Sequence, residues 1–154
     1  MSRGSQYDGA VTTTSTGSES ETAAVGRDLA GTLAAGDVVL LYGDLGAGKT
    51  AFVKGVAEGL GVARDDVSSP TFTLIQEYRG GRLTLFHVDL YRLDDPREIL
   101  DLGLEEIAAG GVLAVEWAEK LDHALEPLRE RRIAVRITHG TGDARTIAVE
   151  ELCN

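Results

Sequence analysis

The stretch YGDLGAGKT, residues 42–50, places three glycines within six positions and follows the last one directly with Lys49 and Thr50. Glycine loses more backbone entropy on folding than any other residue, so this spacing requires a structural reason. Residues 43–50 match G-x-x-x-x-G-K-[ST], a loop whose backbone N–H groups surround the phosphates of a nucleotide. Glycine suits such a loop because it adopts positive φ and carries no side chain that blocks the phosphates. The expected phosphate-binding residues are Gly43, Asp44, Leu45, Gly46, Ala47, Gly48, Lys49 and Thr50.

The sequence on either side of this loop supplies the structural context that the motif requires. Residues 37–43, DVVLLYG, form a short continuous apolar run, which is typical of a strand buried on both faces. Residues 49–60 return to helical spacing, with their apolar side chains on one face. A helix that begins at the loop adds the partial positive charge of its N-terminus to the phosphate site. We therefore expect Lys49 to reach the β- and γ-phosphates of ATP and Thr50 to place its hydroxyl on Mg²⁺.

The rest of the chain alternates between helical and strand patterns. A helix is expected over residues 18–35, ending at Gly36, and one or two short helices are expected between residues 94 and 110. Residues 71–78 and 82–91 predict an antiparallel hairpin. The other expected elements are a strand at 111–117, a helical or irregular segment at 118–131, and closing strands at 132–138 and 145–152. This order predicts an α/β fold, a three-layer sandwich with a mixed central β-sheet.

Length and charge narrow the classes of function that the chain can serve. We expect one ATPase domain over residues 18–154, preceded by a Ser-, Thr- and Gly-rich segment, residues 1–17, that forms a flexible tail or a frayed edge strand. The chain carries 15 basic and 25 acidic residues, a formal net charge of −10, whereas a protein that grips nucleic acid alone usually has a basic face. Any nucleic-acid role is therefore expected to be carried by a partner.

Cysteine usage and the lengths of the apolar runs indicate where in the cell the chain works. Cys153 is the single cysteine, which excludes an internal disulfide framework. The longest apolar runs are only a few residues, far short of a membrane span, and the first 17 residues lack the apolar core of a signal peptide. We therefore expect a cytoplasmic protein that does not bind membranes.

Two carboxylates end apolar strands and are candidates for a metal site. Glu116 ends VLAVE, and Asp89 ends LTLFHVD. A phosphate loop requires an acid near the metal, usually at the end of a neighbouring buried strand, whereas either acid alone could equally be an exposed strand-end group. Two such strands in a chain that already has the loop favour function for both. We expect Glu116 to contact Mg²⁺ through water and Asp89 to contact the attacking water or the metal, and these two roles can be exchanged.

Three other residues are weaker candidates when they are judged from the residues alone. Thr71, in the segment SSPTFT, can bond Mg²⁺ or the γ-phosphate as an ordered switch segment does, but a serine-proline turn explains the segment slightly better. Trp117 follows Glu116 directly and either packs against the nucleotide or fills the core, of which the core is favoured. His87 lies two residues before Asp89 on the same strand face, where a structural histidine is more common than a catalytic one.

Five segments that occur in order make the sequence resemble the TsaE family, also called YjeE. They are GDLGAGKT, SSPTFTLIQEY, HVDLYRL, DLGLEE and VEWAEKL, and the resemblance covers residues 18–150. The phosphate loop alone is shared by many NTPases, whereas its combination with SPTFT, HVDLYR and VEW is specific. TsaE is the small bacterial ATPase required for making tRNA threonylcarbamoyladenosine. The resemblance therefore implies a P-loop NTPase fold and slow, Mg²⁺-dependent hydrolysis of ATP.

The resemblance also implies partners and residue roles. TsaE proteins act with TsaB and TsaD, and TsaD transfers the threonylcarbamoyl group to adenosine 37 of tRNA. By this resemblance the chain binds the TsaB–TsaD complex, resets it between turnovers and meets tRNA only through that complex. Matched to the family's motifs, Lys49 and Thr50 are implied to bind phosphate and Mg²⁺. The resemblance further implies that Glu116 is a metal-linked acid and that Asp89 is the catalytic aspartate. It implies a switch-like role for Thr71 and a place beside the nucleotide for Trp117.

Two positions depart from the family's pattern, and three other functions stay open. Ala51 stands where a second hydroxyl is common, which predicts a weaker α-phosphate contact, and Ala118 stands where proline is usual, which predicts a looser turn. A small-molecule kinase is one alternative, with Arg92 and Arg97 available to clamp a phosphoryl group. The second is a binding module whose nucleotide only stabilises the fold. A GTPase is disfavoured because the sequence has no Asn-Lys-x-Asp segment.

Overall fold

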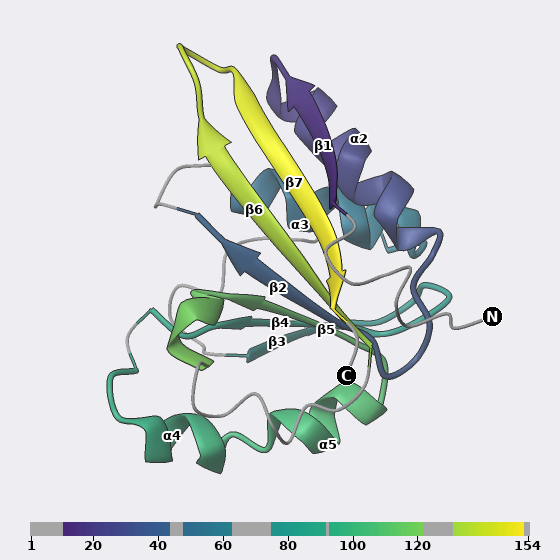
Figure 1. The fold of residues 1–154 in the computed structure, drawn as a ribbon. Helices are drawn as coiled ribbons and strands as arrows, with labels where there is room; N and C mark the ends of the chain where they lie inside the picture. The colour runs from purple at the N-terminus through teal and green to yellow at the C-terminus, as the bar shows by residue number, and fades with distance from the viewer. Residues whose placement is uncertain (1–10, 44–47, 63–74, 92, 122–130, 153–154) are drawn as a thin grey trace, which may run out of the picture.

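Residues 11–43, 48–62, 75–91, 93–121 and 131–152 are described in the computed structural model of this chain, which is built around one seven-stranded sheet (Figure 1). The strands are β1 (Val11–Thr16), β2 (Val38–Tyr42), β3 (Ile75–Tyr78), β4 (Leu85–Asp89), β5 (Val112–Glu116), β6 (Arg132–His139) and β7 (Arg145–Leu152). The helices are α2 (Glu19–Ala30), α3 (Lys49–Gly59), α4 (Pro96–Asp101), α5 (Leu104–Ala109) and the short 3-10 helix η2 (Ala118–Leu121). The expected α/β fold with a mixed sheet is confirmed.

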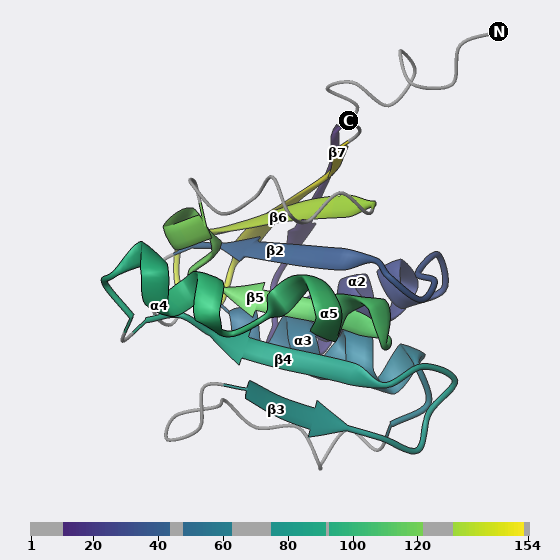
Figure 2. The ribbon, with the colours of Figure 1, turned by 90° about the horizontal axis from the view of Figure 1, so that it is seen from below.

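The sheet is parallel at its centre and antiparallel at its margins, in the order β1-β7-β6-β2-β5-β4-β3. β2 pairs in parallel with β5 on one side and with β6 on the other, and β4 pairs in parallel with β5. The pairs β3–β4, β6–β7 and β1–β7 are antiparallel. Figure 2 shows the arrowheads of β2, β4 and β5 at the same side of the molecule. Side chains at the carboxyl ends of these three strands therefore meet at one edge, where open α/β sheets bind their ligands.

Helices cover both faces of the sheet, with α2 and α3 on one side and α4 and α5 on the other (Figure 2). Each face of the sheet has its own hydrophobic core, and alternate residues of β2 pack into one or the other, because successive side chains of a strand point to opposite faces. Val39 and Leu41 join the core on the α2–α3 side, and Val38 and Leu40 join the core on the α4–α5 side. The continuous apolar run of residues 38–41 therefore forms a strand buried on both faces, as its sequence predicts.

Helices α2 and α3 pack so closely that glycine is required where they meet. A Cβ added to Gly55 would lie 1.8 Å from the carbonyl oxygen of Ala23, and one added to Gly26 would lie 2.3 Å from the carbonyl oxygen of Phe52. Real Cβ atoms do not approach backbone atoms so closely, so a larger residue at either position would push the helices apart. This contact fixes α3, and with it the start of the phosphate loop helix, against the N-terminal part of the chain.

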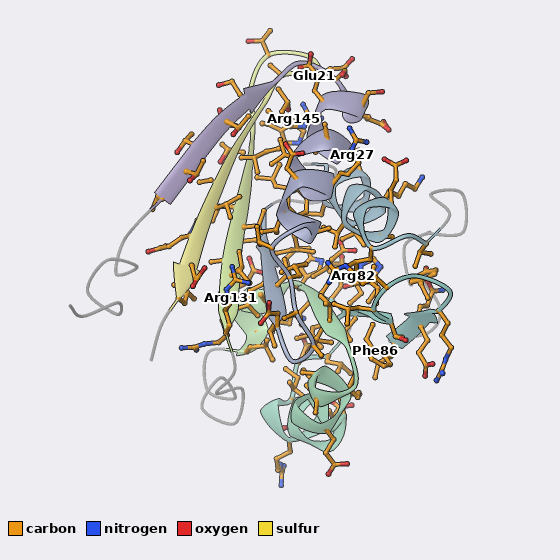
Figure 3. All side chains as sticks on the ribbon, turned by 90° about the vertical axis from the view of Figure 1, so that its right-hand side faces the viewer. Glu21, Arg27, Arg82, Phe86, Arg131 and Arg145 are labelled. Carbon is orange, nitrogen blue, oxygen red and sulfur yellow. The ribbon has the colours of Figure 1, made fainter. Side chains whose placement is uncertain are left out.

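The helix expected over residues 18–35 begins as its sequence predicts but ends earlier. Ser18 Oγ accepts a hydrogen bond from the Glu21 amide at 3.1 Å, so this side chain caps the amino end of the helix. The helix ends at Ala30 rather than at Gly36. Arg82 satisfies carbonyl groups that this early end leaves free, because its guanidinium donates to the carbonyls of Ala30 at 2.7 Å and Leu33 at 3.0 Å (Figure 3 labels Arg82).

Gly36 instead belongs to the turn that leads into β2. Its φ of 97° is positive, and its amide donates to the carbonyl of Gly111 at 2.8 Å. At this end of β2, Asp37 accepts hydrogen bonds at Oδ2 from the Ala34 amide at 2.8 Å and from Arg131 Nη1 at 2.9 Å. Arg131, labelled in Figure 3, also donates from Nη2 to Glu151 at 2.8 Å. This partly buried ionic group, in which Asp37 is the buried member, ties the amino end of β2 to β6 and β7.

The remaining elements follow the sequence patterns with few departures. Residues 11–16 form the edge strand β1, one of the two forms expected for the N-terminal segment. The hairpin of β3 with β4 is antiparallel, and the two short helices α4 and α5 are separated at Gly103, whose φ is 69°. None of the helices in the described part of the chain is long and apolar enough to cross a membrane.

Candidate functional site

The candidate site lies at the carboxyl edge of the central strands, beside the first turn of α3. β2 leads into the phosphate loop at Gly43, and α3 begins on its far side at Lys49. Leu41 and Glu116 are paired across β2 and β5, and Glu116 is paired in turn with Asp89 on β4. The end of β2 and both acidic strand ends are therefore adjacent, as expected from the sequence.

The two described glycines of the loop both have the backbone conformation that the motif demands. Gly43 has a φ of 145° and Gly48 a φ of 104°, values that residues with a side chain adopt only under strain. Gly48 is the N-cap of α3; among the described residues no side chain makes a capping hydrogen bond to this helix end, and its first turn has no acidic residue. The helix therefore presents its N-terminal amides and its partial positive charge without an acidic neighbour in its own first turn. Four expected loop residues, Asp44, Leu45, Gly46 and Ala47, lie outside the described residues.

Lys49 is a buried cation in an unusual setting, with only 4% of its surface exposed. Its Nζ donates to the carbonyl oxygen of Gly43 at 2.8 Å and lies 4.5 Å from the centre of the Trp117 ring. Within the described part of the chain it makes no ion pair, although buried charges are normally paired with an opposite charge. The geometry therefore leaves a concentrated positive charge beside the loop, and an anionic ligand bound there would neutralise it.

Asp89 and Glu116 supply carboxylates on the same face of the sheet as α3. Asp89 Oδ1 accepts a hydrogen bond from the Tyr91 amide at 2.9 Å. Burial raises the pKa of the Asp89 carboxyl above its usual value of 3.8; the Tyr91 amide lowers it, the charge of Glu116 raises it, and His87 and Lys49 lower it. The net result is a carboxyl group that holds a proton more readily than an ordinary aspartate.

His87 lies closer to the site than its sequence pattern indicates. Its ring is fully buried, and its Nε2 lies 2.5 Å from Oε2 of Glu116, which is only 5% exposed. The sequence suggested a structural histidine, and nothing in it paired His87 with Glu116, which is 29 residues away. The only sequence signal was that His87 shares a strand face with Asp89.

Trp117 lies directly after β5 in a strained backbone conformation. Its φ of 62° makes it the only non-glycine residue with positive φ in the described ranges, and such outliers gather at functional sites. Its ring packs at the edge of the core on the α4–α5 side and lies 5.0 Å from the ring of Tyr91, which is 53% exposed. Trp117 therefore packs at the edge of the core, while the face of its ring lies beside Lys49.

Lys120 holds the segment after β4 against the segment after β5. Its Nζ donates to the carbonyls of Tyr91 at 2.7 Å and Leu93 at 2.8 Å, and to Asp94 Oδ1 at 3.2 Å. Neither Lys120 nor Tyr91 was among the expected site residues. Both belong to the segments HVDLYRL and VEWAEKL, so position next to Asp89 and Trp117 was the signal that could have identified them.

The donor set fits magnesium held together with phosphates rather than a metal held by protein alone. No group of three or more His, Cys, Asp or Glu side chains suited to a metal occurs among residues 11–43, 48–62, 75–91, 93–121 and 131–152. Mg²⁺ usually takes one or two carboxylates and completes its shell with phosphate oxygens and water. Glu116 and Asp89 provide such carboxylates, and Thr50 lies in the first turn of α3. Thr71 lies outside the described residues.

Comparison with known proteins gives a consistent result. The family model described as "Threonylcarbamoyl adenosine biosynthesis protein TsaE" matches residues 16–147. The tRNA threonylcarbamoyladenosine biosynthesis protein TsaE of Bacillus subtilis is 47% identical over 135 residues, which are 87% of this chain and 82% of that protein. The TsaE protein of Nostoc sp. is 50% identical over 97 residues, 60% of this chain and 59% of its own length. The crystal structure of Bacillus subtilis YdiB matches with a TM-score of 0.74 and 37% identity, over 94% of this chain and 87% of the other.

Proposed function

The chain belongs to the TsaE family, the proteins of tRNA threonylcarbamoyladenosine biosynthesis, and on that premise we propose that it is a Mg²⁺-dependent ATPase. One domain, residues 18–154, carries the activity. It binds the TsaB–TsaD complex, and its slow hydrolysis of ATP resets that complex between turnovers. Its contact with tRNA is indirect, through the complex, which agrees with its net charge of −10.

The observation that carries this proposal is the buried ammonium group of Lys49. It has a carbonyl and an aromatic ring as neighbours but no ion pair in the described part of the chain. A triphosphate bound by the amides of the loop and of the first turn of α3 supplies the missing negative charge. Lys49 then leaves Gly43 and reaches the β- and γ-phosphates, where it stabilises the negative charge that develops during phosphoryl transfer.

Thr50 and Glu116 hold the metal. The Thr50 hydroxyl would bind the metal directly, and the Glu116 carboxylate would hold it through water, as in other phosphate-loop enzymes. Mg²⁺ held there would neutralise negative charge on the phosphates. The carboxylate of Glu116 is well suited to this task because it is almost wholly buried at the end of a rigid central strand.

Asp89 orients the attacking water. Its Oδ1 is engaged by the Tyr91 amide, which leaves Oδ2 for the water molecule. The raised pKa of Asp89 supports this role, because a carboxylate that binds a proton more readily is a better general base. Trp117 packs beside the nucleotide, and Thr71 senses the γ-phosphate and transmits its loss to the partner proteins.

The proposal is tested by phosphate release from ATP with purified protein, alone and with TsaB and TsaD. We expect Mg²⁺-dependent release without any added acceptor, accelerated by the partners, and its loss in Lys49→Ala. Turnover that requires a small-molecule acceptor would instead indicate a kinase. If the Lys49→Ala variant is no longer stabilised by ATP but still functions in cells, the protein is a binding module whose nucleotide only stabilises the fold.

The partner part of the proposal has a separate test. We expect TsaB and TsaD to retain this chain in a pull-down to a different extent with a non-hydrolysable ATP analogue and with ADP. Retention that does not depend on the nucleotide contradicts the reset cycle and leaves the ATPase proposal standing. Competition between ATP and GTP for binding tests the base preference in the same samples.

A further inference from the structure

We propose that His87 is a positioning residue for Glu116, a role that rests on the proposed Mg²⁺-dependent ATPase. The imidazole holds one oxygen of the Glu116 carboxylate, so that the other oxygen faces the metal site. Neither the sequence pattern nor the role expected for Glu116 requires such a partner. The inference comes from the contact between the two side chains, Nε2 to Oε2 at 2.5 Å.

Strand pairing explains why these two residues meet. His87 of β4 is paired with Ala114 of β5, and Glu116 lies two positions further along the same face. The diagonal neighbour on an adjacent strand is within reach of long side chains. Ala114, which lies opposite His87, has a small side chain, and this leaves room for the imidazole to lean toward Glu116. Neither strand lies at an edge of the sheet, and each pairs with a strand on both sides, so the contact is set by rigid elements.

The hydrogen-bond partners define which nitrogen carries the proton. A carboxylate only accepts hydrogen bonds, so Nε2 of His87 must be the donor to Glu116. Nδ1 is buried and has no hydrogen-bond partner among the described residues, so a proton placed there would be left without an acceptor. The contact therefore specifies the tautomer with hydrogen on Nε2, which is the form that can hold the carboxylate.

This arrangement is of the kind that orients metal ligands in other proteins. Groups that hydrogen-bond a ligating carboxylate fix its rotamer, and their loss typically lowers metal affinity or activity by about 10- to 100-fold. Glu116 needs such support because it lies at the strand end, immediately before the strained residue Trp117. Without His87, the carboxylate can rotate away from the metal while the strand itself stays in place.

The test compares four variants in a measurement that does not depend on turnover. His87→Gln keeps an N–H donor close to the position of Nε2, whereas His87→Leu removes the donor and His87→Asn places it near Nδ1. Asp37→Ala is the matched control, because it removes a partly buried ionic contact at the end of β2 that lies away from the site. The readout is the half-saturating Mn²⁺ concentration with a non-hydrolysable ATP analogue, followed by EPR, together with ATP affinity in EDTA.

We expect His87→Leu to weaken Mn²⁺ binding by about 10- to 100-fold, with metal-free ATP affinity nearly unchanged, and we expect His87→Gln to recover most of the loss. Unaltered Mn²⁺ binding in His87→Leu, or an equal loss in Asp37→Ala, overturns the proposal. If His87→Leu does not fold, the comparison of His87→Gln with His87→Asn tests the proposal. We expect the Gln variant to bind Mn²⁺ more tightly, and equal Mn²⁺ affinity in the two variants contradicts a role for the Nε2 donor.

A second readout separates this inference from the proposed function. Long-range ¹H–¹⁵N spectra of the metal-free protein report which nitrogen of each histidine carries a proton, and the variants assign the signal of His87. We expect the proton on Nε2, and a proton on Nδ1 overturns the proposal. A wild-type protein that binds neither ATP nor Mn²⁺ refutes the proposed function, and the spectrum still decides whether His87 holds Glu116.

Discussion

Asp89 and Glu116 face each other across adjacent parallel strands, paired residue to residue at the carboxyl ends of β4 and β5. This pairing brings two carboxylates to the same edge of the sheet at which β2 enters the phosphate loop. Two like charges that are close together and partly buried are costly unless a cation joins them. The pairing therefore links the stability of the ligand-free protein to the function proposed for it.

Replacement of Lys49 tests whether its charge serves the ligand rather than the fold. We expect Lys49→Met to lower ATP hydrolysis by about 100-fold or more, because one preformed charge contact to the reacting phosphate is lost. The melting temperature without nucleotide should stay equal or rise, because the variant no longer buries an ammonium group that lacks an ion pair in the described part of the chain.

The single tryptophan provides the measurement for this variant. Trp117 lies under the Lys49 ammonium group, so nucleotide binding that moves Lys49 should change its fluorescence. We expect an ATP-dependent change in the wild-type protein and a smaller one in Lys49→Met. A marked drop in the melting temperature of the ligand-free variant would indicate that Lys49 is needed mainly for folding.

The pKa of Asp89 predicts how its replacement changes stability with pH. A carboxyl whose folded-state pKa is raised stabilises the fold only when protonated, and that contribution is lost as the pH rises through the folded-state value. At neutral pH the ionised Asp89 therefore costs stability. We expect Asp89→Asn to melt at a higher temperature than the wild type at pH 7, and the difference to shrink as the pH falls toward 3.8.

Thermal unfolding of the nucleotide-free proteins across this pH range measures the effect. The same variant should hydrolyse ATP far more slowly, because it lacks the carboxylate proposed to orient the water. A lower melting temperature for Asp89→Asn at neutral pH is the outcome that this explanation does not permit.

The ionic group at the other end of β2 should contribute to stability alone. Asp37 is buried and accepts hydrogen bonds from Ala34 and Arg131, so Asp37→Ala should destabilise the protein by about 2 kcal/mol. Hydrolysis per folded molecule should be unchanged. Urea unfolding measures the change in stability, and ATPase assays on the same sample measure the rate per folded molecule. A lower hydrolysis rate in a fully folded Asp37→Ala sample would show that this end of β2 influences the site.

The close approach of α2 and α3 makes Gly55 a sensitive position. Gly55→Ala places a methyl group where the Ala23 carbonyl lies, so we expect a loss of about 3 kcal/mol or more. Gly31→Ala is the matched control, because Gly31 has an ordinary φ of −63° and its nearest atom would lie 3.4 Å from the added carbon. Equal unfolding midpoints in urea for the two variants would refute the packing argument.

Much of this molecule follows from local patterns in its sequence. The apolar run of residues 38–42 predicts β2, the spacing after Lys49 predicts α3, and the motif predicts positive φ at some loop glycines, as found at Gly43 and Gly48. These features depend on neighbours in the chain, which is why pattern and period are sufficient to find them.

Features that depend on distant residues could not be found in this way. The contact of His87 with Glu116 requires knowing that β4 lies beside β5, and the hydrogen bond from Arg82 to the carbonyl of Ala30, the last residue of α2, joins residues 52 positions apart. The glycines between α2 and α3 give no periodic signal, because they are explained only by the backbone of the other helix. Strand order and helix contacts, rather than secondary structure, were what the sequence left undetermined.

The central claim is that the loop between β2 and α3 holds a triphosphate, with Lys49 on its phosphates, Glu116 turned to a magnesium ion and Asp89 turned to the attacking water beside it. A crystal structure of the protein with Mg²⁺ and a non-hydrolysable ATP analogue tests it most directly. We predict phosphate density against the amides of Gly48 and Lys49, with Lys49 Nζ moved from the Gly43 carbonyl to a phosphate oxygen. Phosphates bound elsewhere, or Asp89 and Glu116 both directed away from the metal, would contradict it.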